Sequence, residues 1–157
     1  MIIFYICVKY SCLLSCIFII QTFKTNMKYY ENKPQGYYDN VREEMLKYLP
    51  ENAKKVLDIG CGNGAFASVV KDKNKAEVWG IELMEVEAKV AVDVLDKVFV
   101  GNCEKYINGL PEKYFDVIYM NDVLEHLVDP YTVLETLKSK LAPNGVVISS
   151  IPNVRFF

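Results

Sequence analysis

From residue 37 onward, the chain alternates short apolar segments with segments whose apolar residues recur at helical spacing, and this alternation limits the possible fold more than any other feature. Strands are predicted over residues 56–60, 77–83, 98–100, 115–120 and 146–151, and helices over residues 37–49, 66–72, 84–95 and 129–141. Asp129-Pro130 is typical of a helix start, because an aspartate can cap free N–H groups and proline suits the first helical position. Pro143-Asn144-Gly145 is expected to end that helix.

Short links between alternating strands and helices favour parallel strands joined by right-handed crossovers. The predicted fold is therefore α/β, a doubly wound parallel sheet of about five strands with helices on both faces. Ligands of such sheets bind beyond the carboxyl ends of the strands, where the strand order reverses. The residues that directly follow each strand are thus the candidates for a binding site.

The first of these positions is a glycine-rich loop. Segment 58–64 (Asp-Ile-Gly-Cys-Gly-Asn-Gly) places glycines at alternate positions between a strand and a helix, where a missing Cβ lets a ligand approach the backbone. It also matches a dinucleotide-binding fingerprint, with Glu82 about 20 residues beyond Gly60, so NAD and S-adenosylmethionine are both candidate ligands. Asp58 favours S-adenosylmethionine, because a carboxylate attracts its ammonium and sulfonium but repels a pyrophosphate. The alternative is that Asp58 only braces the loop.

Segment 56–64 resembles the glycine-rich motif of class I S-adenosylmethionine-dependent methyltransferases, and the resemblance runs from about residue 37 to the C-terminus. It implies a Rossmann-like fold with S-adenosylmethionine as the cofactor. Glu82 matches the family's acidic residue that accepts both ribose hydroxyls; the alternative is a solvated glutamate that opens a helix. The family normally continues with two more strands, so the resemblance implies a sheet that is incomplete at the C-terminus.

Two later segments extend the implied site. Asn102 stands where the family has an aspartate that accepts a hydrogen bond from the adenine amino group. An amide oxygen can accept that bond, but without charge assistance. Cofactor binding is therefore expected to be retained but weaker. Asn121 and Asp122 are expected near the methionine portion of the cofactor. The cofactor-binding residues implied in this way are Asp58, Gly60, Cys61, Gly62, Gly64, Glu82, Leu83, Asn102, Cys103, Asn121 and Asp122.

Segment 122–127 (Asp-Val-Leu-Glu-His-Leu) resembles small-molecule methyltransferases, a group that includes ubiquinone-pathway O-methyltransferases. The resemblance implies direct in-line methyl transfer, and the expected reaction is O-methylation of a small molecule. A hydroxyl acceptor needs a proton acceptor near neutral pH, and His126, the only histidine, is the candidate general base. The alternative for His126 is a packing role in its loop. The alternatives for the chain are an NAD-dependent oxidoreductase and a catalytically inactive, truncated cofactor-binding module.

The charge balance and the cysteine content limit which kinds of ligand or partner are expected. Lys and Arg total 18 against 20 for Asp and Glu, a net charge of -2, which gives no overall field that would attract nucleic acid. A small-molecule partner without nucleic acid is therefore expected, and the oligomeric state stays open. The 5 cysteines include no C-x-x-C pair and no cysteine–histidine cluster, so no metal site is expected and the thiols are interpreted as reduced, in a cytoplasmic protein.

The first 26 residues differ in character from the rest. Residues 2–20 are almost wholly apolar and approach the length of a membrane-spanning helix, although Lys9 near the middle opposes insertion. An inserted segment would leave the following domain in the cytoplasm, because basic residues cluster on its C-terminal flank. The alternative is that translation starts at Met27. Residues 1–26 are thus interpreted as an apolar extension, either a membrane anchor or sequence before the true start, and residues 27–157 as the S-adenosylmethionine-binding domain.

Overall fold

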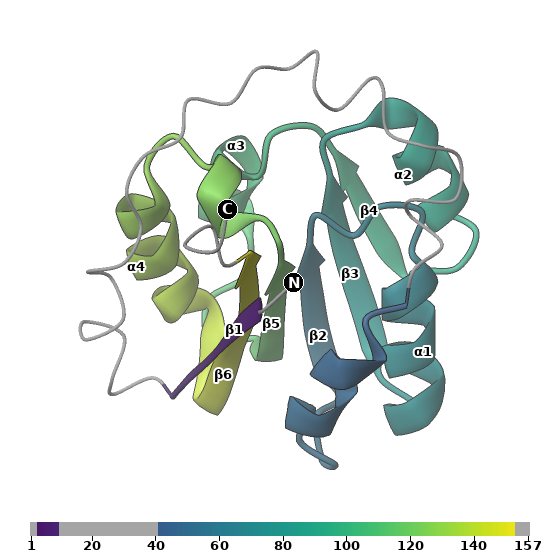
Figure 1. The fold of residues 1–157 in the computed structure, drawn as a ribbon, viewed down its shortest axis with the longest axis horizontal. Helices are drawn as coiled ribbons and strands as arrows, with labels where there is room; N and C mark the ends of the chain where they lie inside the picture. Colours follow the sequence, from purple (N-terminus) through teal and green to yellow (C-terminus); the bar gives the residue numbers. More distant parts are fainter. Residues whose placement is uncertain (1–2, 10–40, 153–157) are drawn as a thin grey trace.

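The computed structural model describes residues 3–9 and 41–152, with side chains from residue 41 to residue 151. Figure 1 shows the described elements. The strands are β1 (Ile3–Lys9), β2 (Lys55–Ile59), β3 (Glu77–Glu82), β4 (Lys97–Val100), β5 (Phe115–Asn121) and β6 (Leu141–Pro152). The α-helices are α1 (Ala65–Asn74), α2 (Glu85–Ala91), α3 (Cys103–Tyr106) and α4 (Pro130–Lys140). Three short 3-10 helices are η5 (Glu43–Tyr48), η6 (Ile107–Gly109) and η7 (Leu124–His126).

The sheet has 6 strands in the order β1-β6-β5-β2-β3-β4. Strands β2 to β6 pair in parallel, which confirms the predicted five-stranded parallel α/β architecture. The chain runs outward from β2 through β3 to β4 and then returns to β5 on the other side of β2. The strand order therefore reverses between β2 and β5, and the carboxyl ends of these strands mark the expected ligand site.

The sixth strand, β1, was not predicted, and it pairs antiparallel with β6. It belongs to the apolar run 2–20 that is nearly long enough for a membrane-spanning helix, but isoleucine, phenylalanine, tyrosine and valine also favour strands, and Ile3–Lys9 adopts one. Residues 10–20 and Met27 lie outside the described part of the chain. Among the described residues, no helix has both the length and the apolar character that a membrane crossing requires.

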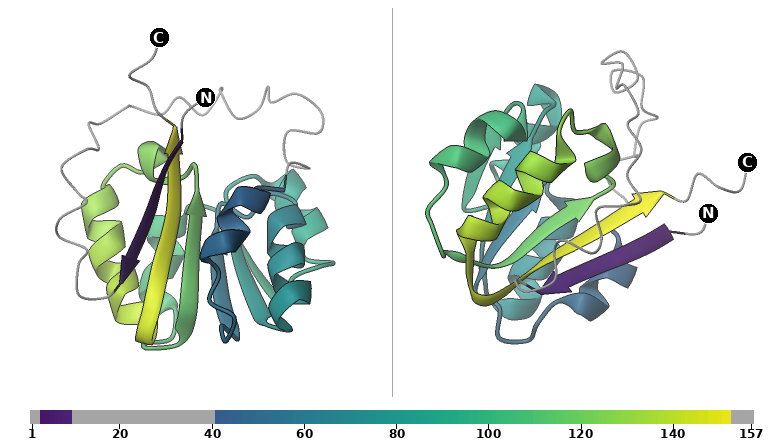
Figure 2. Two further views of the ribbon diagram at one scale, coloured as in Figure 1. Left: turned by 60° about the horizontal axis from the view of Figure 1, so that its bottom comes forward. Right: turned by 90° about the vertical axis from the view of Figure 1, so that its left-hand side faces the viewer.

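Helices cover both faces of the sheet, as Figure 2 shows. On one face, α3 and α4 pack over Leu57, Ile118 and Met120, and on the other, α1, α2 and η5 pack over Val56, Val117 and Tyr119. Neighbouring residues of β2 and β5 thus enter opposite cores, because successive side chains of a strand point to opposite faces. Two apolar layers hold the central strands and fix the positions of their carboxyl ends.

Several element boundaries differ from the prediction. The first helix is only the six-residue η5, and residues 37–40 lie outside the described chain. Helix α2 ends at Ala91, four-residue α3 was missed, and β6 begins at Leu141 rather than at residue 146. The expected turn at residues 143–145 lies inside β6 as an irregularity: the β5–β6 register shifts there, and Asn144 has a φ of 66°. The α4 start is as predicted, with Asp129 accepting a bond from the Thr132 N–H at 3.0 Å.

Candidate functional site

The carboxyl ends of four parallel strands meet around the glycine-rich loop that follows β2. The Gly60 N–H donates to the Ile81 carbonyl at 2.8 Å, and the Gly101 N–H donates to the Glu82 carbonyl at 2.7 Å, so the segments after β2, β3 and β4 are joined by backbone bonds. A Cβ at Gly60 would lie 2.5 Å from Val123 Cγ2, which brings the segment after β5 against the same loop. The structure therefore gathers the predicted segments at one edge of the sheet.

Glycine is required in this loop for conformation as well as space. Gly60, Gly62 and Gly64 have φ angles of 75°, 55° and 85°, in the left-handed region that other residues avoid. Gly64 is also the N-cap of α1, and a Cβ there would lie 2.7 Å from Val94 Cγ2. The loop can thus wind tightly from β2 into α1 with its backbone close to the sheet edge.

Glu82 lies buried at the end of β3 and braces this loop. Its carboxylate accepts hydrogen bonds from the Gly62 N–H and the Met84 N–H, each at 2.8 Å. Burial raises the pKa of Glu82 above its ordinary value, although these backbone bonds act in the opposite direction. Glu82 is therefore not the solvated helix-opening glutamate that its sequence position also allows.

Asp58 is the second buried carboxyl group of the site, with a relative exposure of 2%. Its Oδ1 receives no hydrogen bond from the described residues. Burial, together with the nearby charge of Glu82, raises the pKa of Asp58 to about 8. A buried carboxyl oxygen without a donor is costly, and a cationic ligand would both pair with Asp58 and favour its ionised form.

The thiol of Cys61 lies within the field of both carboxylates. Burial first, and then the charges of Asp58 and Glu82, raise the pKa of Cys61 above its ordinary value. The thiol is therefore held neutral, and it packs in the core beside Val56 and Phe66. Cys61 lies at the predicted site as a packing residue, with its backbone in the loop.

The segment after β5 carries Asn121 and Asp122, both of which were predicted as site residues. Asn121 Oδ1 is buried and has no hydrogen-bond partner among the described residues. Asp122 has a φ of 54°, and its carboxylate accepts from Arg42 and, at 2.9 Å, from Ser150 Oγ. Asn121 thus presents an unused acceptor, whereas Asp122 is already held by two partners.

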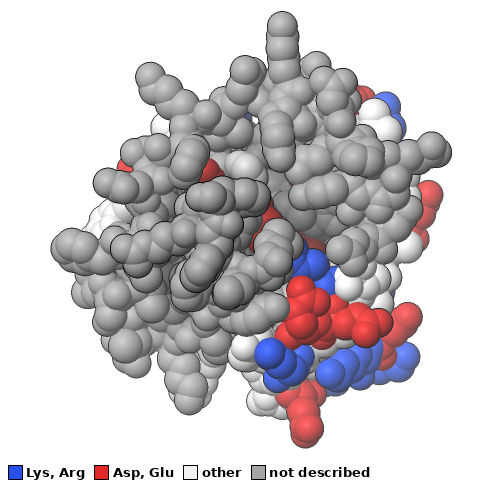
Figure 3. Space-filling view, in the orientation of Figure 1, with Lys and Arg blue, Asp and Glu red and all other residues white. Residues whose placement is uncertain are grey.

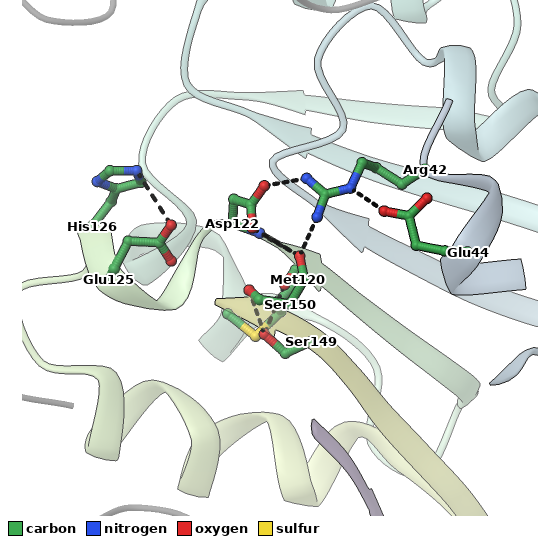
Figure 4. A network of polar contacts seen from close by, with 8 residues as sticks. All are labelled: Arg42, Glu44, Met120, Asp122, Glu125, His126, Ser149 and Ser150. Carbon is green, nitrogen blue, oxygen red and sulfur yellow. Dashed lines mark hydrogen bonds and ion pairs between the residues drawn. The ribbon is translucent and has the colours of Figure 1, made fainter. Parts of the chain in front are cut away.

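Arg42 was missed by the sequence analysis. Its guanidinium, with 15% of its side chain exposed, pairs with Asp122 and Glu44, and its Nη2 donates to Ser150 Oγ at 3.3 Å. Burial lowers the pKa of Arg42, but the bonds and charges of Asp122 and Glu44 outweigh it, so the pKa is raised and the charge is firmly held. Figure 4 shows this arginine reaching across to Asp122. No local pattern marks a pair that lies 80 residues apart in sequence.

The remaining predicted cofactor residues lie around β3 and β4. Leu83 follows Glu82 and is 39% exposed, so an apolar surface borders the site. Asn102 caps α3 by accepting from the Glu104 N–H at 2.8 Å. Cys103 is buried in the core, where burial and Glu104 raise its pKa to about 11. The amide oxygen of Asn102 is thus engaged in a helix cap, a role that the prediction of an adenine contact did not include.

His126 lies at the end of η7, on the other side of Asp122 from Arg42 (Figure 4). Its side chain is 32% exposed, and its Nε2 lies 3.7 Å from Glu125 Oε1. Glu125 is more deeply placed, with 17% of its side chain exposed. A carboxylate beside a partly exposed imidazole can orient the ring.

Comparison with known proteins identifies the family. A family model described as a methyltransferase domain matches residues 29–157. The chain belongs to the methyltransferase-domain family. This domain is 33% identical over 125 residues to a ubiquinone biosynthesis O-methyltransferase of Histophilus somni, over 71% of this chain and 52% of that protein. It is 34% identical over 115 residues to an uncharacterized protein of Haemophilus influenzae, over 68% of this chain and 45% of that protein. The methyltransferase domain thus spans about half the length of these relatives.

Solved structures share the fold of the methyltransferase domain. A SAM-dependent methyltransferase of Archaeoglobus fulgidus superimposes with a TM-score of 0.66 at 23% identity, over 82% of this chain and 60% of that chain. Phosphoethanolamine N-methyltransferase 2 of Haemonchus contortus was solved in complex with S-adenosyl-L-methionine. It superimposes with a TM-score of 0.62 at 21% identity, over 69% of this chain and 27% of that chain. At these identities the likeness shows the fold alone. The family match confirms the prediction of a methyltransferase domain, and the shared fold confirms its predicted Rossmann-like architecture.

The surface and the polar groups of the methyltransferase domain add two observations. Where the described surface is visible in Figure 3, acidic and basic side chains lie next to one another instead of forming a field of one sign. Among the residues that the structure describes, no group of 3 or more His, Cys, Asp and Glu side chains could hold a metal ion.

Proposed function

We propose that this domain binds S-adenosylmethionine at the carboxyl ends of β2, β3 and β5 and transfers its methyl group to a hydroxyl of a small-molecule acceptor. The single observation that carries the proposal is the pair of buried carboxyl groups, Asp58 and Glu82, beside a glycine loop. A pyrophosphate would compete with the ionised forms of these two carboxyl groups, whereas a cationic nucleoside would pair with them and favour ionisation of Asp58. Family membership and the named O-methyltransferase relative support the reaction class.

Each side chain has a defined part in binding. Glu82 is already oriented by two backbone N–H groups, and a carboxylate in that position can accept both ribose hydroxyls. At the strand ends, Asp58 Oδ1 and Asn121 Oδ1 are buried acceptors that receive no hydrogen bond from the described residues, and both suit the ammonium of the methionine portion. Leu83 offers an exposed apolar side chain beside the ribose-binding carboxylate.

The main task of the protein in methyl transfer is to align the acceptor oxygen with the methyl group of the cofactor. When bound, S-adenosylmethionine supplies a methyl carbon made electrophilic by its sulfonium, so that bond formation to an acceptor oxygen and cleavage of the carbon–sulfur bond occur together. Residues on rigid strand ends can hold the two reactants in line, which is worth up to about 7–11 kcal/mol in well-oriented systems. Asp58 and Glu82 are fixed in this way by β2 and β3.

His126 is the proposed proton acceptor for the hydroxyl. Its imidazole is partly exposed and has the Glu125 carboxylate 3.7 Å away, so it can take up a proton that the acceptor oxygen loses. Replacement by glutamine is expected to lower kcat for phenol or alcohol acceptors by about 100-fold or more, with unchanged affinity for S-adenosylhomocysteine. Undiminished turnover by His126→Gln would assign this residue to packing.

The cofactor is tested by calorimetric titration of the chain with S-adenosylhomocysteine and, separately, with NAD. We expect binding of the first and none of the second. Glu82→Gln should weaken binding, and Glu51→Gln, which removes the same charge from an exposed turn before β2, is the matched control. Binding of NAD, or of neither ligand, contradicts the proposal.

A further inference from the structure

The antiparallel strand β1 occupies the outer edge of β6 along most of its length. Seven residue pairs run from Ile3 opposite Pro152 to Lys9 opposite Val146. Strand β5 pairs along the other side of β6, so the 146–150 stretch has a neighbour on both edges. Figure 2 shows β1 lying alongside β6 in both views. Without β1, this stretch would have one unpaired edge, and its backbone would open more readily.

Strand β6 also holds the loop that carries Asp122. The Asp122 N–H donates to the Ser150 carbonyl at 3.1 Å and lies 3.1 Å from Ser150 Oγ, and that hydroxyl donates back to the Asp122 carboxylate at 2.9 Å. The hydroxyl also accepts from Arg42 at 3.3 Å. One residue earlier, Ser149 Oγ donates to the Met120 carbonyl at 2.7 Å. Figure 4 shows both serines beneath Asp122.

These serines stand directly opposite β1. Tyr5 pairs with Ser150, and Ile6 pairs with Ser149. Both serines are almost completely buried, with relative exposures of 0% and 1%. A shift of β6 at this point would therefore move the hydroxyl that Arg42 and Asp122 share.

We propose that residues 3–9 are a positioning strand of this domain, which fixes Ser150 through β6 and thereby holds Asp122 and Arg42 at the edge of the cofactor site. The expected effect of β1 on cofactor affinity rests on the proposed function, whereas its expected effect on the position of Asp122 does not. It gives the apolar start of the sequence a role inside the fold that neither of its two sequence interpretations included.

A proline scan of the full chain at Phe4, Tyr5, Ile6 and Cys7 tests the inference. In an antiparallel pair, the N–H groups of successive residues point alternately toward the partner and away from it, and proline on an edge strand is tolerated only where the N–H points away. The alternate pairs of positions are 4 with 6 and 5 with 7. We expect the two variants of one pair to lower the Tm and to speed amide exchange of Asp122 by about tenfold or more. The same two variants should weaken S-adenosylhomocysteine binding by about tenfold. The other pair serves as the matched control and should stay within about twofold of the wild type.

The readouts separate the possible failures. Equal effects at all four positions would show that β1 is not paired as described and would overturn the inference. Alternating Tm values with unchanged Asp122 exchange would show a purely structural strand and would also overturn it. If the wild-type chain binds no S-adenosylhomocysteine, the proposed function fails, while alternating exchange at Asp122 still supports the positioning role.

Discussion

Cofactor binding should release a proton from Asp58. Burial and the charge of Glu82 raise the pKa of this carboxyl to about 8, so most molecules carry a protonated Asp58 at neutral pH. The ammonium of the ligand favours the ionised form, which lowers the pKa in the complex. Because ligand and proton compete, affinity must rise with pH below about 8.

The size of the effect follows from the ionised fraction. With a pKa of about 8, that fraction is about 1% at pH 6 and about 9% at pH 7. The affinity for S-adenosylhomocysteine should therefore increase about tenfold between these two pH values, which corresponds to about 1.4 kcal/mol. At pH 7, close to one proton should leave the protein for each ligand bound.

Calorimetry at pH 6 and pH 7, in buffers of different ionisation enthalpy, measures both quantities. Asp58→Asn should bind weakly at both pH values and release no proton, whereas Asp72→Asn, an exposed aspartate on α1, should behave like the wild type. A wild-type affinity that is the same at pH 6 and pH 7, without proton release, would refute the assignment of Asp58 to the ligand ammonium.

Four further outcomes are expected. Glu82→Gln should weaken S-adenosylhomocysteine binding by about 10–100-fold in calorimetry, because an amide cannot accept from two N–H groups and both ribose hydroxyls with the strength of a carboxylate. Gly60→Ala should lower the free energy of unfolding by at least about 1–3 kcal/mol, because φ is 75° and a side-chain carbon lies 2.5 Å from the added Cβ; Gly109→Ala, with nothing within 4 Å, should stay within about 1 kcal/mol in the same denaturant titration. Asn102→Asp should keep the α3 cap and strengthen cofactor binding, so an unchanged dissociation constant would remove this residue from the adenine site. Without ligand, the wild type should lose stability as pH rises from about 4 to about 8, because folded Asp58 keeps a proton that the unfolded chain has lost. Asp58→Asn lacks this titration, so its Tm should rise relative to that of the wild type over the same range. A Tm difference that does not change with pH would contradict the raised pKa.

The central architecture could be predicted because its signals are local. Helix α4 starts at Pro130 because Asp129 caps it, and β5 is buried on both sides because its central residues 117–120 are apolar. The loop after β2 needs left-handed backbone conformations, and three closely spaced glycines in the sequence indicate such a loop. Asp58 and Glu82 follow from the same reasoning, since both lie at or beside strand ends.

Long-range pairing explains what the sequence did not reveal. The bond between Arg42 and Asp122 joins residues that are far apart in the chain, and neither residue carries a periodic or motif signal for the other. Strand β1 was obscured for a similar reason, because an apolar run near helical length has no feature that selects an antiparallel partner at residues 146–152. The boundaries of β6 shifted because a turn-forming Asn144 is accommodated as an irregularity within the strand.

A crystal structure of the chain with S-adenosylhomocysteine would show directly whether Asp58 and Glu82 form the cofactor site. We expect the ribose hydroxyls within hydrogen-bonding distance of the Glu82 carboxylate and the ligand ammonium on the side of Asp58 and Asn121. A ligand bound elsewhere on the domain, or a ribose that leaves Glu82 untouched, would contradict the claim that these buried carboxylates form the cofactor site.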